Sequence, residues 1–75
     1  MKLYAAITPT TCNVTRYRKI SEFYEIYELI HGLLEDEYTE EECHYIAEDV
    51  ACWCETHFLG ETYEHELFTV TIIED

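Results

Sequence analysis

Four cysteines and four histidines are the residues of this chain with zinc-binding chemistry. On a helix, Cys52 and Cys54 point ~200° apart and cannot share an ion. Cys43 lies ~16 Å from Cys54 by helical rise. Only Cys54 and His57, one turn apart, are well spaced, and they need Cys12 or a second chain to complete a site. We expect no metal and no cofactor. The alternative is a small metal-binding or redox module that uses Cys54 and His57.

The surroundings of the cysteines also oppose catalysis. A nucleophilic thiol requires a neighbouring base and an electropositive setting, whereas this chain has 17 Asp and Glu against 4 Lys and Arg. Paired acids are abundant, but general acid–base chemistry also requires an environment that tunes one of them. Only two glycines are present, which leaves little for a Gly-rich phosphate loop. The sequence therefore predicts a protein that is not an enzyme.

The acidic residues are separated from the basic ones along the chain. All 17 acids lie from Glu22 onward, and no Lys or Arg follows Lys19. Like charges one turn apart on a helix repel by ~0.2–0.5 kcal/mol, and a merely solvated surface normally interleaves Lys or Arg. The candidate partner-binding residues lie on the outward faces of two predicted helices: Glu25, Glu28, Glu35, Asp36, Glu41, Tyr45, Glu48, Asp49 and Glu55.

An anionic surface of this kind attracts a basic groove. Basic grooves commonly hold nucleic acid, whose duplex carries a charge every ~1.7 Å of its axis. We interpret the chain as a decoy that occupies a nucleic-acid-binding surface of another protein. Two alternatives remain open, namely the acidic proteome of a halophile and a structural homo-oligomer with an acidic solvated surface. The one basic cluster, residues 16–19, is expected to pair with the chain's own acids.

Two helical patterns carry these carboxylates. In the first, apolar residues recur at helical spacing over residues 23–34, and Ser21 is the expected N-cap. The second begins with a capping box, Thr39-x-x-Glu42, and Gly60 is its expected stop. Its apolar face comprises Cys43, Ile46, Ala47, Val50, Cys54, His57 and Phe58.

Alternating apolar and polar residues predict strands at both ends of the chain, over residues 2–8 and 67–73. Whether residues 13–19 form a further strand is left open. Pairing the terminal strands allows both helices to cover one face of a sheet. The prediction is a single α+β domain of residues 1–75, with two antiparallel helices on a small antiparallel sheet, in the order β-(β)-α-α-β.

The size of the chain bears on its stability and location. A domain of 75 residues buries only ~60% of its unfolded surface, and a net charge of −13 opposes compaction. A homodimer that adds buried surface is therefore expected. The apolar run at the N-terminus is too short for a signal peptide or a membrane span. We expect a cytoplasmic protein with reduced thiols and no membrane contact.

In its size, its composition and its acid-faced helices between Glu22 and Glu55, the chain resembles the small acidic proteins that phages and mobile elements direct against host defence. These include anti-CRISPR proteins and anti-restriction DNA mimics. No family motif is matched, so no functional residue is transferred. The resemblance implies a target in the host cytosol, a CRISPR or restriction nuclease or its guide complex, and no direct contact with nucleic acid.

Overall fold

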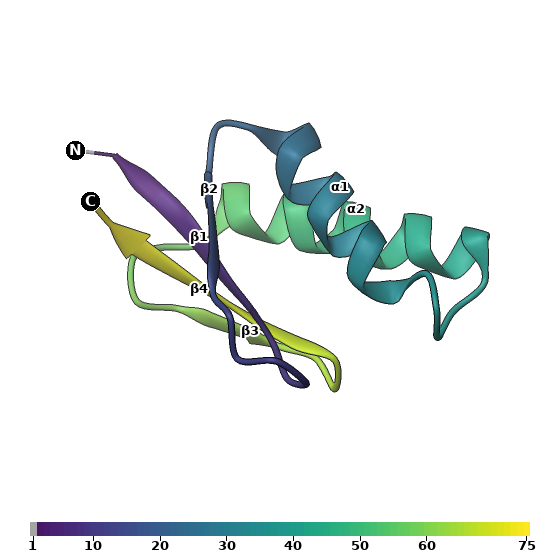
Figure 1. Ribbon diagram of the computed structural model, residues 1–75. Coiled ribbons are helices and arrows are strands. Elements are labelled where there is room, and N and C mark those ends of the chain that lie inside the picture. The colour runs from purple at the N-terminus through teal and green to yellow at the C-terminus, as the bar shows by residue number, and fades with distance from the viewer. Residues whose placement is uncertain (1) are drawn as a thin grey trace.

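The computed structural model describes residues 2–75 as two helices and one antiparallel sheet. The elements are β1 (Leu3–Pro9), β2 (Arg16–Lys19), α1 (Phe23–Leu34), α2 (Glu40–Thr56), β3 (Thr62–Glu64) and β4 (Phe68–Glu74). The strand order is β2-β1-β4-β3. Both helices lie against the same face of the sheet, with α2 running back along α1 toward the sheet (Figure 1). The predicted α+β architecture is confirmed.

The two terminal strands form the centre of the sheet. Their register runs from Leu3 opposite Glu74 to Pro9 opposite Phe68, so both ends of the chain lie side by side (Figure 1). β2 pairs with β1 as a hairpin, which places Tyr4 opposite Lys19. Residues 16–19 of the segment left open from the sequence are thus an edge strand.

The other edge strand, β3, was not predicted. It is only three residues long and pairs with β4, with Thr62 opposite Thr71 and Glu64 opposite Thr69. Its sequence, Thr-Tyr-Glu, contains a single large apolar side chain, which is too short a pattern to signal alternation. Gly60 precedes it with a φ of +90°, a conformation that favours glycine.

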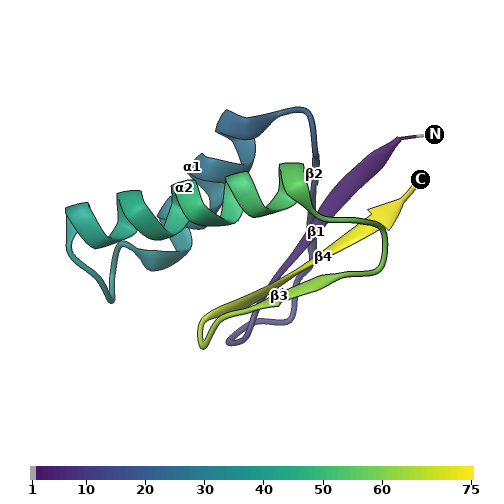
Figure 2. The same cartoon turned by 180° about the vertical axis from the view of Figure 1, so that it is seen from behind.

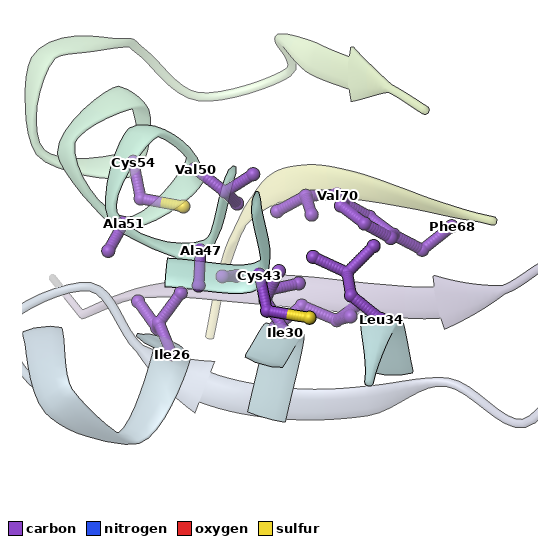
Figure 3. Packing of buried hydrophobic residues seen from close by; sticks show 12 residues of the cluster. Ile26, Ile30, Leu34, Cys43, Ala47, Val50, Ala51, Cys54, Phe68 and Val70 are labelled. Atoms are coloured by element: carbon purple, nitrogen blue, oxygen red, sulfur yellow. The ribbon is translucent and has the colours of Figure 1, made fainter. Parts of the chain in front are cut away.

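The hydrophobic core lies between the helices and the sheet (Figure 3). Its fully buried side chains come from both helices and from the inward positions of β1 and β4: Ala5, Ile7, Ile26, Ile30, Leu34, Cys43, Ala47, Val50, Ala51, Cys54, Phe68, Val70 and Ile72. Each large apolar side chain contributes ~1.5–3 kcal/mol on burial. Among residues 2–75 no polar or charged residue is buried, so the acids all remain at the surface.

The two helices begin differently. At α2 the Thr39 hydroxyl accepts from the Glu42 amide at 3.2 Å, and the Glu42 carboxylate accepts from the Thr39 amide at 3.1 Å. The predicted capping box is therefore confirmed. At α1 the prediction of Ser21 as N-cap was wrong, because the helix begins one residue later, after Glu22, whose side chain makes no capping hydrogen bond.

The end of α2 also differs from the prediction. The helix stops at Thr56, whose hydroxyl donates to the Cys52 carbonyl at 3.2 Å, and His57 is extended. Gly60 lies four residues beyond the helix, so it does not stop it. Phe58 was predicted on the buried face but is 77% exposed, because the helix ends before its side chain can turn toward the core.

Candidate protein-binding surface

The outward side of α2 presents five exposed residues as one continuous row, which we call the α2 stripe: Glu41, Tyr45, Glu48, Asp49 and Cys52. Their spacings of three, four and seven residues bring them to the same side of the helix. The capping box fixes where the helix begins, and buried residues such as Ala47 and Val50 turn its other side to the core. Local helix geometry therefore positions the stripe.

An open groove of about 500 Å³ lies between the stripe and β3. Its lining residues are Tyr45, Ile46, Glu48, Asp49, Cys52 and Tyr63. Figure 2 views the molecule from the side on which α2 and β3 lie in front. The Tyr63 hydroxyl donates to the Asp49 carboxylate at 3.3 Å and so connects the strand to the helix. The groove combines two carboxylates with two aromatic rings.

Tyr63 is held in place by its aromatic neighbours. The Trp53 ring meets it edge to face at 5.6 Å between centroids and is itself stacked on His57 at 4.7 Å. Burial, reinforced by Asp49, raises the pKa of Tyr63 above its ordinary value. The hydroxyl therefore stays protonated at neutral pH and remains a donor to Asp49.

The carboxylates of the stripe lack Lys and Arg partners. Within residues 2–75 the single ion pair involving Lys or Arg joins Lys19 to Glu22, at 4.0 Å. Glu48 lies 3.7 Å from the His44 imidazole, which carries charge only when protonated. Because Glu41 and Asp49 form no ion pair within residues 2–75, these residues do not neutralise the charge of the stripe.

Three other candidate residues lie beside cations. Glu25 and Glu28 share a cleft with Arg18 next to β2. Glu55, near the end of α2, lines a separate hollow with Lys2. None of these acids lies within 4.0 Å of a Lys or Arg nitrogen in the described residues, but the nearby cations lower the negative potential there.

The last two candidates, Glu35 and Asp36, are exposed in the turn between the helices. They do not line the groove. The structure therefore divides the nine candidates: it gathers Tyr45, Glu48 and Asp49 at the groove, leaves Glu41 further along the same helix face, and disperses the rest.

The sequence interpretation missed Tyr63, which forms the far wall of the groove. Tyr63 lies on β3, the strand without a recognisable pattern, so no sequence signal indicated that it lies next to α2. The exposure of two apolar residues beyond the helix was also missed, because α2 was predicted to extend as far as Gly60 but ends at Thr56. Phe58 is 77% and Leu59 52% exposed in the loop that follows α2.

The alternative metal pair is poorly arranged for binding. Cys54 is buried in the core (Figure 3), and burial, with a smaller contribution from Glu55, raises the pKa of its thiol to about 12. The thiol is therefore protonated at neutral pH, and metal binding requires the thiolate. The His57 Nδ1 atom lies 2.8 Å from the Trp53 carbonyl oxygen. Residues 2–75 contain no group of three His, Cys, Asp or Glu able to hold an ion.

Comparisons of the chain with protein-family models, curated proteins and solved structures find no match. Within the described residues, no helix is both long and apolar enough to cross a membrane. Functional interpretation therefore depends on the charge and geometry of the surface.

Proposed function

We propose that this protein is a non-enzymatic binding protein that occupies a basic, nucleic-acid-binding surface of another protein through its α2 stripe. The observation that carries the proposal is the exposure of Glu41, Glu48 and Asp49 on one helix face without a Lys or Arg within ion-pair distance in residues 2–75. Repulsion among these acids weakens the isolated fold, and cations supplied by a partner would relieve it.

The groove supports the same partner chemistry. Arg and Lys side chains form short charge-assisted hydrogen bonds with carboxylates such as Glu48 and Asp49. The same cations are attracted to the faces of aromatic rings, which Tyr45 and Tyr63 supply in the groove. Tyrosine is also enriched in protein interfaces because a large apolar ring carries a polar end.

The net charge of −13 acts at longer range. Opposite potentials on the two partners accelerate encounter and make association depend on salt. In its most specific form, we propose a target among the nucleases of host defence, a CRISPR or restriction enzyme, reached in the host cytosol by a phage-type inhibitor. The resemblance in size and composition supports that choice of target.

The test is capture of partners from a lysate at about 50 mM NaCl, followed by elution with duplex DNA or RNA. The bait is the full chain, compared with a stripe variant carrying Glu41→Lys and Glu48→Lys. A control variant with Glu64→Lys and Glu74→Lys has the same net charge but changes acids of β3 and β4. Circular dichroism verifies that each variant is folded.

We expect a nucleic-acid-binding protein that is retained by the wild type and the control, lost by the stripe variant and displaced by nucleic acid. Equal loss with both variants would show that net charge, and not the stripe, drives binding. Retention by the stripe variant, or failure of nucleic acid to displace the partner, would reject the proposal.

A further inference from the structure

A second groove, which we call the hairpin groove, lies between α1 and the β1–β2 hairpin. Its volume is about 340 Å³. The apolar part of its lining comes from Ile7 and Pro9 of β1 and from Leu29 and Leu33, which are one turn apart on α1. Sites for small molecules are mostly apolar and begin at ~300 Å³, so the hairpin groove has room for a ligand of small size.

One cation and one anion face the hairpin groove. Arg16 of β2 lies opposite the buried Ile7, so its side chain is directed to the helix side of the sheet, and Glu28 extends from α1. The other polar lining residues are Thr11 and Cys12. Within residues 2–75 Arg16 forms no ion pair, and no nitrogen of its side chain lies within 4.0 Å of the Glu28 carboxylate. The two charges therefore border the same groove without pairing.

Gly32 also lines the hairpin groove, in the last turn of α1. Glycine inside a helix lowers its stability relative to alanine. The backbone does not require glycine here, because the φ angle of Gly32 is not positive. Nor does packing require it, since an added Cβ would meet no atom within 4 Å. The missing side chain leaves space in the groove at the expense of the helix.

From this arrangement we infer that the hairpin groove binds a free apolar amino acid. The apolar side chain would lie over Leu29 and Leu33 beside Gly32, the carboxylate would pair with Arg16, and the ammonium group would pair with Glu28. Both contacts are charge-assisted hydrogen bonds. An amino acid carries its two charges close together, so it can bridge two side chains that do not pair with each other.

Charge also selects this class of ligand over simple ions. An anion attracted to Arg16 would meet Glu28 in the same groove and the repulsion of a protein with a net charge of −13. A cation attracted to Glu28 would leave Arg16 without a partner. A zwitterion has no net charge and satisfies both side chains.

This inference is independent of the proposed function. The hairpin groove lies at β2, whereas the groove beside the α2 stripe lies at β3, and these are the two outer strands of the sheet. Loss of amino-acid binding would therefore leave the proposed role of the α2 stripe unaffected.

Titration of the full chain with L-leucine and with L-phenylalanine, followed by the NMR shifts of the backbone amides, tests the inference. Three related compounds each lack one part of the ligand. N-acetyl-L-leucine has no ammonium group, L-leucinamide has no carboxylate, and glycine has no apolar side chain.

Three variants test the groove itself. Arg16→Gln removes the cation, and Arg18→Gln is its matched control, because Arg18 lies on the same strand but borders a different cleft, with Glu25 and Glu28. Gly32→Leu places a side chain in the groove. Circular dichroism verifies that each variant is folded.

We expect both amino acids to shift the amide signals of groove residues such as Gly32 and Cys12, and the three related compounds to bind about tenfold more weakly or less. Arg16→Gln should weaken binding of leucine by a similar factor, and Arg18→Gln should leave it nearly unchanged. Gly32→Leu should abolish binding and raise the midpoint of thermal unfolding, because leucine favours the helix more than glycine does.

Three results would each overturn the inference. The first is the absence of shifts at about 10 mM leucine or phenylalanine. The second is equal binding of N-acetyl-L-leucine, which would mean that Glu28 does not recognise the ammonium group. The third is equal weakening by Arg16→Gln and Arg18→Gln, or unchanged binding by Gly32→Leu, which would place the ligand elsewhere.

Discussion

The helix side and the sheet side of this small protein differ in the charges that they carry. On the helix side, every acid from Glu25 to Glu55 is exposed, and the α2 stripe has no Lys or Arg partner in residues 2–75. On the sheet side, the face turned away from the helices, the bare face, carries two charges of opposite sign, with Lys19 opposite Tyr4 and Glu64 opposite Thr69. Strand β4 contributes to both, because Phe68, Val70 and Ile72 face the helices while Thr69, Thr71 and Ile73 face outward.

This difference implies that salt acts mainly on the helix side. Binding of a basic partner to the α2 stripe weakens as ions screen the attraction, whereas a face with one charge of each sign has little net field to screen. Substitutions on the two faces of the shared sheet show how much each face contributes to stability.

The largest expected effect comes from removing a side chain that packs under the helices. Phe68→Ala should lower the free energy of unfolding by ~3–5 kcal/mol, because the Phe68 ring is fully buried in the folded protein and its removal leaves a cavity in the core. Tyr17→Ala, on the bare face, should change it by less than ~1 kcal/mol. Denaturation by urea measures both. Similar losses for the two variants would mean that the bare face is as important for folding as the core.

A matched exchange within β4 has a smaller effect. Val70→Thr should cost ~1–3 kcal/mol, because it places a hydroxyl in the apolar core. Thr71→Val, the reverse change one residue later, should leave the unfolding free energy within ~0.5 kcal/mol. Urea denaturation measures both changes. A stabilised Val70→Thr protein would contradict the assigned faces.

Alkaline pH probes Cys54, one of the two buried thiols on the helix side. The pKa of Cys54 is raised from 9.0 to about 12, so the protonated form is favoured in the folded state. The stability this confers is fully present below pH 9 and is lost between pH 9 and about 12, where the unfolded chain ionises first. Cys54→Ala should flatten this decline by up to ~1.4 kcal/mol per pH unit.

The control for the thiol is Cys52→Ala, since Cys52 is exposed on the α2 stripe. This variant should retain the wild-type dependence of unfolding free energy on pH. If Cys54→Ala and the wild type lose stability in parallel above pH 9, the Cys54 thiol is not the group responsible.

The smallest effect concerns the starts of the two helices. Thr39→Ala removes the hydroxyl of the capping box and should cost ~1 kcal/mol of unfolding free energy. Ser21→Ala should cost close to nothing, because Ser21 lies outside α1 and a different residue stands at its N-cap. Thermal unfolding of the two proteins decides this point, and an equal cost would indicate a capping role for Ser21.

Local patterns account for the elements that could be predicted from the sequence. The apolar spacing of residues 23–34 predicts α1, the Thr39-x-x-Glu42 box predicts the start of α2, and alternation over residues 67–73 predicts β4 within one residue. In each case, the residues that specify the element are neighbours in the chain. β3 and the end of α2 escaped prediction because their positions depend on pairing with β4 and on packing, which no short pattern encodes.

The candidate surface was predictable only in part. The exposure of Tyr45, Glu48 and Asp49 follows from helical spacing. The contribution of Tyr63 does not, because β3 brings it to α2 from fourteen residues beyond Asp49. Nor does helical spacing reveal that Glu28 lies beside Arg18, since that proximity depends on the β1–β2 hairpin next to α1.

The sequence by itself determined the segregation of charge along the chain, the two helical faces and the strands at both ends. These properties depend on residue order and on interactions within a few positions. The tertiary structure alone decided which acids remain away from cations and which sheet face remains bare. Both depend on contacts between distant segments, because the position of a side chain relative to another element is set only when the elements pack together.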